Sequence, residues 1–169
     1  MIILGIDPGF AITGYGLIAV KGRVMSHVAD GVIRTKEGDL HYKRLLQVAK
    51  ALQAVIKRYK PHFAVIEELF VYKNVKTAMK VGEARGVILL TLARMHVPIF
   101  ELSPLQIKQS LTGYGRATKT QMQKMVQRVL RLDTPPQPDD AADALAAAIC
   151  FNQTPYLISP LYEGRETTI

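Results

Sequence analysis

The sequence is poor in cysteine, in long apolar runs and in repeated segments. Its single cysteine, Cys150, excludes a disulfide bond within the chain. The 4 histidines stand far apart and show no Cys/His spacing typical of a structural zinc site. No apolar run approaches the ~18 residues needed to cross a bilayer. We therefore expect a soluble, cytoplasmic protein that has no disulfide bond, no structural zinc and no association with a membrane.

Acidic residues are also in the minority. The 169-residue chain has 22 Lys and Arg residues against 14 Asp and Glu, a formal net charge of +8. Such an excess attracts polyanions such as nucleic acid. The length and a 49% hydrophobic content suit one domain with its own core. We expect this domain over residues 1–152, followed by a flexible C-terminal tail, residues 153–169, in which the periodicity ends.

Hydrophobic periodicity predicts an α/β fold. A short apolar run at residues 2–6 and two β-rich stretches after it predict a three-stranded antiparallel meander. After this, the spacing of apolar residues alternates between the helical period and the strand period, which is typical of β-α-β units. The expected helices cover residues 45–59 and 78–95, and the other expected strands cover residues 15–20, 23–35, 63–66 and 97–102. We therefore expect a mixed five-stranded sheet with helices on both faces.

Further helices are expected in the last part of the chain. Ser103, followed by proline, supplies a side-chain cap and a first helical residue that needs no N–H. Thr118 and Gln121 form the pattern of a capping box before an amphipathic segment. The proline-rich residues 133–138 are expected to be extended. The Ala-rich residues 140–150 are expected to form a helix whose small side chains pack closely on a sheet.

Two carboxylates directly follow predicted strands. Asp7 ends the first apolar run and begins an Asp-Pro-Gly turn, in which Gly9 is expected to take the positive φ of a type II turn. Glu67 ends the apolar run at residues 63–66, with Glu68 beside it as an alternative. Taken alone, Asp7 is explained equally well by turn chemistry, and Glu67 by a strand end that meets solvent.

Two more carboxylates share one helix face. Asp140 and Asp143 are three residues apart at the start of the Ala-rich helix, so both project to the same side. The helix dipole favours acids here and Asp139 is a candidate N-cap, but neither effect accounts for Asp143, one turn inside. With Asp7 and Glu67 they provide the oxygen ligands that hard divalent ions prefer. Two such ions roughly 3.5 to 4 Å apart can hydrolyse a phosphodiester, so an acidic set in a basic chain predicts a nuclease.

A basic stretch without acids is the second functional signal. Residues 105–132 contain no Asp or Glu, and phosphate contacts are expected from their basic residues, namely Lys108, Arg116, Lys119, Lys124, Arg128 and Arg131. Lys73, Lys76 and Lys80 are interleaved with Phe70 and Tyr72, and Phe70 is a candidate for stacking on bases. The alternative for any single lysine is a solvated helix face, and the alternative for Phe70 is the core.

These residues resemble the RuvC family of Holliday junction resolvases, which are nucleases of the RNase H-like fold. Four motifs have the order and spacing of the family: Gly5-Ile6-Asp7-Pro8-Gly9, Ile66-Glu67-Glu68-Leu69-Phe70 with Lys73-Asn74, Lys108-Gln109, and Asp140-Ala141-Ala142-Asp143-Ala144-Leu145-Ala146. The resemblance covers about residues 1–152.

The resemblance implies a homodimer that resolves four-way junction DNA by paired symmetric nicks, in homologous recombination and DNA repair. It implies Mg²⁺, for which Mn²⁺ can substitute, with two ions expected at four catalytic acids, Asp7, Glu67, Asp140 and Asp143. Lys108 and Lys119 would lie near the scissile phosphate, and Phe70 would contact junction bases. Asp139 and Glu68 fall outside the family's acids. A branch-migration helicase complex is a further expected partner.

Three alternatives share part of this pattern. A YqgF-like RNA-processing nuclease has a similar first motif, but Pro8 and the segment from Phe70 to Asn74 disfavour it. A sugar kinase or actin-like ATPase also begins with a strand and an Asp-Gly turn, but it needs two such domains. A non-catalytic DNA-binding module would account for the charge. It would leave the four carboxylates unexplained, because acids in a DNA groove repel phosphate unless metal offsets them.

Overall fold

The chain folds around one sheet. The computed structural model describes residues 1–68 and 75–154, apart from the side chains of residues 75 and 76. The strands are β1 (Ile2–Asp7), β2 (Ile12–Lys21), β3 (Val24–Arg34), β4 (Phe63–Glu67) and β5 (Ile99–Leu102). The helices are α1 (His41–Tyr59), α2 (Val75–Arg94), α3 (Pro104–Thr112), α4 (Lys119–Leu130) and α5 (Asp139–Asn152).

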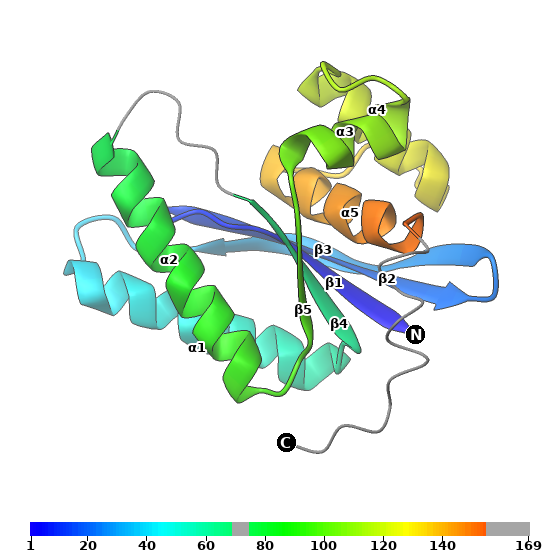
Figure 1. Cartoon of the computed structure of the whole chain (residues 1–169). Coiled ribbons are helices and arrows are strands. Elements are labelled where there is room, and N and C mark those ends of the chain that lie inside the picture. The colour runs from blue at the N-terminus through cyan, green and yellow to red at the C-terminus, as the bar shows by residue number, and fades with distance from the viewer. Residues whose placement is uncertain (69–74, 155–169) are drawn as a thin grey trace.

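The sheet is mixed, with five strands in the order β3-β2-β1-β4-β5. The first three strands form an antiparallel meander, whereas β4 runs parallel to β1 and β5 runs parallel to β4. Helices α1 and α2 cover one face of the sheet, and α3, α4 and α5 cover the other (Figure 1). The predicted fold class, a mixed five-stranded sheet with helices on both faces, is therefore confirmed.

Each face of the sheet has its own hydrophobic core, because successive side chains of a strand point to opposite faces. In β1, Leu4 and Ile6 pack against α1 and α2. Ile3 packs on the other side, against α5. The same alternation places Asp7 and, in β4, Glu67 on the face that α5 covers. Strand pleating thus points both carboxylates away from α1 and α2.

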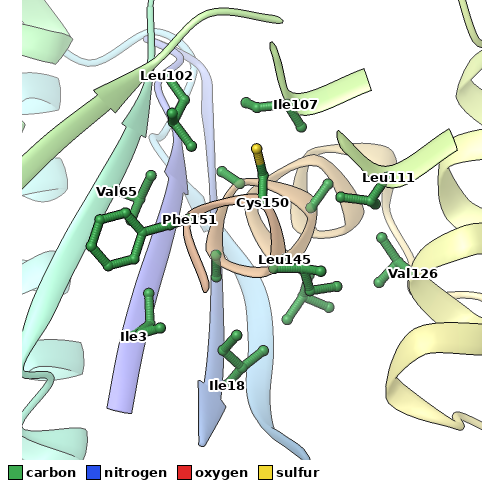
Figure 2. Close-up of a cluster of buried hydrophobic side chains, with 14 of the residues drawn as sticks. Ile3, Ile18, Val65, Leu102, Ile107, Leu111, Val126, Leu145, Cys150 and Phe151 are labelled. Carbon is green, nitrogen blue, oxygen red and sulfur yellow. The ribbon is translucent and has the colours of Figure 1, made fainter. Parts of the chain in front are cut away.

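Helix α5 lies in the middle of the second core, between the sheet and helices α3 and α4. Figure 2 shows Leu145, Cys150 and Phe151 of α5 reaching toward Ile3 and Val65 of the sheet and toward α3 and α4. The residues of α5 from 144 to 151 are buried without exception. This burial explains the alanine content of the helix, since small side chains allow its backbone to approach the strands closely.

Glycines of the sheet make this approach possible. A Cβ atom added to Gly5 of β1 would lie 1.8 Å from the carbonyl oxygen of Ala144, and one added to Gly14 of β2 would lie 1.9 Å from that of Asp140. Both distances are far below van der Waals contact. The backbone of α5 therefore sits directly on the glycines of β1 and β2, and this contact sets the height of its acidic N-terminal turn above the sheet.

The predicted helix caps at Ser103 and Thr118 are confirmed as two reciprocal capping boxes. The Ser103 hydroxyl accepts a hydrogen bond from the Gln106 N–H, and the Thr118 hydroxyl accepts one from the Gln121 N–H at 3.3 Å.

The prediction for Gly9 is wrong, because Gly9 is not among the residues with positive φ. Glycine is needed there because a Cβ would lie 1.9 Å from the Ile12 carbonyl oxygen.

The N-terminus of α5 also differs from the prediction. Pro138 rather than Asp139 is the N-cap residue, and no side chain caps this helix. The Asp139 carboxylate instead accepts a hydrogen bond from Gln123 of α4, 2.9 Å long.

The boundary between a domain at residues 1–152 and a tail at 153–169 stays a prediction, because residues 155–169 lie outside the described part of the chain. Among the residues described, no helix is long and apolar enough to span a membrane.

Candidate active site

Two carboxylates end neighbouring parallel strands at one edge of the sheet. Asp7 is the last residue of β1 and Glu67 the last of β4. The register pairs Ile6 with Ile66, so Asp7 and Glu67 follow at the same level of adjacent strands. Since both strands run in the same direction, their side chains leave the sheet on the same face. This register brings the ends of the two strands, and with them Asp7 and Glu67, to the same place on the sheet.

Helix α5 brings two further carboxylates to this edge. Gly14 of β2 pairs with Asp7, and the space above Gly14 is filled by the backbone and Cβ of Asp140. Asp143 lies one helical turn further along α5 and lines a cavity together with Glu67. Three elements, β1, β4 and α5, therefore place the four predicted acids together, although Asp7 and Asp143 are far apart in the sequence.

The pKa values show that these carboxylates interact. Burial, followed by the charges of Glu67, Asp143 and Asp140, raises the pKa of Asp7 to about 8. Burial and then the charge of Asp143 raise the pKa of Glu67 to about 7. The pKa of Asp143 is also raised, mainly by burial, although Lys119 lowers it. A cluster of half-buried carboxylates that repel one another is stabilised by a bound cation.

Two lysines complete the site. The cavity that Glu67 and Asp143 line has a volume of about 180 Å³, and Lys108 of α3 and Lys119 of α4 stand on its wall. Both lysines lower the pKa of Glu67, so their ammonium groups lie within electrostatic range of the acids. A hollow of about 270 Å³ between α3 and α4 is larger, but none of the described residues that line it is acidic. The acidic cavity is therefore the candidate active site.

The donor set fits divalent metal ions better than any other cofactor. Its four carboxylates offer hard oxygen ligands, and repulsion between neighbouring carboxylates adds to burial in raising the pKa values of Asp7 and Glu67. Within residues 1–68 and 75–154, no three acidic, histidine or cysteine side chains are already arranged so that they could hold a metal ion. Metal binding here therefore requires side-chain rotations that bring the carboxylate oxygens together.

Removing one acid is expected to stabilise the metal-free protein at alkaline pH. The pKa of Asp7 is higher in the folded chain than in the unfolded chain, so protonation of this carboxyl stabilises the fold. This stabilisation is complete below about pH 4 and is lost as the pH rises to about 8. Asp7→Asn in a chelating buffer should therefore melt higher than wild type, by on the order of 5 °C at pH 8. Thermal melts from pH 4 to 8, with Glu68→Gln as control, test this. A difference that does not grow with pH would contradict it.

The remaining predicted DNA-binding residues are placed only in part. Phe70 and Lys73 lie outside the described residues, and Lys76 lies in the first turn of α2 without a described side chain. Arg116 is exposed in the segment that joins α3 to α4.

Asp139 was predicted from the sequence only as a candidate N-cap, with no part in the site. Its ion pair with Lys119, 3.5 Å long, had no local signal, because the two residues are far apart in the sequence.

The fold and the acidic cavity together define a metal-dependent nuclease with an RNase H-like fold. Comparison with known proteins narrows the class further. The family model described as crossover junction endodeoxyribonuclease RuvC matches residues 3–151. The chain belongs to this RuvC family, and the resemblance noted in its sequence motifs is confirmed.

Individual relatives agree with this assignment. The crossover junction endodeoxyribonuclease RuvC of Thermosipho melanesiensis is 51% identical over 151 residues, which cover 89% of this chain and 96% of the relative. The Petrotoga mobilis protein of the same name is 51% identical over 150 residues, 89% of this chain and 92% of the relative. The structure of Thermus thermophilus RuvC in complex with a Holliday junction substrate is similar, with a TM-score of 0.87 and 32% identity over 94% of this chain and 96% of that one.

Proposed function

We propose that this chain resolves four-way DNA junctions by paired symmetric nicks, in homologous recombination and DNA repair. The main support is that Asp7, Glu67, Asp140 and Asp143 lie within electrostatic range of one another. Two of them, Glu67 and Asp143, line one small cavity together with Lys108 and Lys119. Membership of the RuvC family supports the substrate class. Because the proposed substrate is DNA, we also propose a cytoplasmic location.

The four acids are the proposed catalytic residues and metal ligands. Mg²⁺, replaceable by Mn²⁺, is the proposed cofactor, and four carboxylates suit two ions per site. Such ions, when bound, supply Lewis-acid chemistry at a phosphodiester. The chain's own part is to hold the acids in place at the end of β1, the end of β4 and the first two turns of α5. Lys108 and Lys119 would stabilise the charge that develops on the phosphate.

The basic residues outside the cavity would hold the DNA. Arg116 is exposed beside α4, which suits contact with a backbone phosphate. Lys73 and Lys76 are proposed as further phosphate contacts and Phe70 as a base contact, on the sequence motif alone. A branch-migration helicase complex remains a proposed partner on the same ground.

Incubation with a synthetic four-way junction tests this function directly. With Mg²⁺ we expect two symmetric nicks in the junction and little cutting of a matched linear duplex, and we expect no cutting of either in EDTA. Structured RNA serves as the third substrate. Preferential cutting of the RNA would favour the YqgF-like alternative, and binding without any cutting would favour a non-catalytic DNA-binding module.

Symmetric nicking requires two active sites, and we propose that α2 forms the interface between two copies of the chain. One face of α2 packs into the core, since Ala84, Ile88 and Leu92 are fully buried. The opposite face is exposed and carries Met79 and Leu90. Gly82 and Gly86 lie on this face with open space around them, which permits the close approach of a second helix.

Gly86→Arg should break this dimer and leave the fold intact. The arginine meets no atom within 4 Å of its Cβ in the single chain, but it would fill the gap between two helices. We expect a monomer by analytical ultracentrifugation at micromolar concentration and at least about a tenfold loss of paired nicking. Val24→Asp, at an exposed apolar residue on the β2–β3 hairpin, is the control. A Gly86→Arg dimer as strong as the wild-type dimer would place the interface elsewhere.

A further inference from the structure

Lys119 forms an ion pair with Asp139, which is not among the residues that line the acidic cavity. It is the first residue of α4, and its long side chain is 71% exposed. Its Nζ atom lies 3.5 Å from Oδ2 of Asp139, the first residue of α5. A lysine at the N-terminal end of a helix meets the positive end of the dipole, so it needs a partner anion to stay in a defined position.

Asp139 is itself fixed by a third side chain. Its Oδ1 atom accepts a hydrogen bond of 2.9 Å from Nε2 of Gln123, which also donates to the carbonyl oxygen of Pro136 at 3.4 Å. Gln123 lies one turn after Lys119 on α4. The Asp139 carboxylate therefore has one oxygen bound by Gln123 and the other facing the ammonium group. Together the three side chains bridge α4 and α5.

The acids of the active site compete for the same ammonium group. Burial lowers the pKa of Lys119, but the charges of Asp143, Asp139 and Asp140 raise it above its ordinary value. Lys119 also lines the cavity together with Glu67 and Asp143. Without Asp139, the strongest remaining attraction on Lys119 comes from Asp143. An ammonium group paired with Asp143 would occupy a carboxylate needed for metal binding, and it would be withdrawn from the DNA phosphate.

We propose that Asp139 is a positioning residue, which holds Lys119 at the rim of the cavity and keeps it from pairing with the acids inside. This inference rests on the proposed nuclease function. In this role Asp139 acts through its ion pair with Lys119 and does not bind the metal. It also explains why both oxygens of Asp139 have partners on α4 although the residue stands next to Asp140.

Asp139→Asn removes the charge and keeps an oxygen for Gln123, so the fold should be retained. We expect single-turnover cleavage of a four-way junction in Mg²⁺ to slow by about tenfold. Junction binding in EDTA should be unchanged or tighter, because one negative charge is lost. Direct titration of the DNA-free protein with Mn²⁺ should show several-fold weaker binding. Asp133→Asn, an exposed acid in the same α4–α5 connection, is the charge-matched control and should leave all three values unchanged.

A double-mutant cycle with Lys119→Ala decides whether Asp139 acts through the lysine. In the Lys119→Ala background, Asp139→Asn should change neither cleavage nor Mn²⁺ affinity further. An equal loss in both backgrounds would overturn the inference, because it would show a direct effect of the Asp139 charge on the metal. Normal cleavage by Asp139→Asn would also overturn it. Failure of the wild-type protein to cut the junction would instead reject the proposed function, and the inference with it.

Discussion

Asp7→Asn and Asp143→Asn should each abolish junction cutting while junction binding persists. Asp7 and Asp143 stand on different elements but share one electrostatic cluster, and a neutral amide is a poorer ligand for a hard divalent ion. Losing several kcal/mol of transition-state stabilisation corresponds to at least about a thousandfold fall in rate. Binding should hold or tighten, since a charge that repels phosphate has been removed. Single-turnover cleavage and equilibrium binding measured on the same junction separate the two effects.

The control for these variants is a neighbouring acid. Glu67→Gln should behave like Asp7→Asn, because Glu67 lines the cavity. Glu68→Gln removes the same charge one residue later, outside the residues that line that cavity, and should cut at close to the wild-type rate. Full activity in Asp7→Asn or Asp143→Asn would end the metal-ligand hypothesis for that residue. Equal loss in Glu67→Gln and Glu68→Gln would point to general electrostatics instead.

Gly5→Ala should strongly destabilise the contact between α5 and the sheet. Its Cβ would lie 1.8 Å from the carbonyl oxygen of Ala144, which is backbone and cannot rotate away as a side chain can. Either α5 lifts from the sheet or β1 bends. Overpacking typically costs about 1 to 3 kcal/mol, and this clash with backbone should reach or exceed about 3 kcal/mol. A thermal melt should fall by roughly 10 °C.

A matched glycine substitution distinguishes this clash from a general effect of alanine. Gly82 lies in helix α2, and nothing stands within 4 Å of the Cβ that alanine would add. In the Gly86→Arg background, which is expected to be monomeric, Gly82→Ala should therefore stabilise the chain by about 0.5 to 1 kcal/mol through helix propensity. Because α5 carries Asp140 and Asp143, any folded fraction of Gly5→Ala should also cut poorly. A Gly5→Ala protein with wild-type melting and cutting would show that α5 does not rest on this glycine.

Local patterns were enough to predict most elements and their caps. Apolar runs of strand length end at Asp7 and Glu67, and both residues do end strands. The side-chain cap at Ser103 and the capping box at Thr118 could be predicted because each involves residues only three apart. The prediction for Gly9 was wrong because turn statistics suggested a positive φ, whereas a close contact with the Ile12 carbonyl requires the glycine.

The sequence by itself determined most strands and helices, the four candidate acids and the family to which their spacing belongs. These properties depend on near neighbours and on motif order, which the chain carries along its length. Only the tertiary structure decided which acids share a cavity, because the β1–β4 register and the seating of α5 on Gly5 and Gly14 are contacts between distant segments. It also decided that Asp139 faces Lys119, since an ion pair between two helices leaves no periodic signal in the sequence.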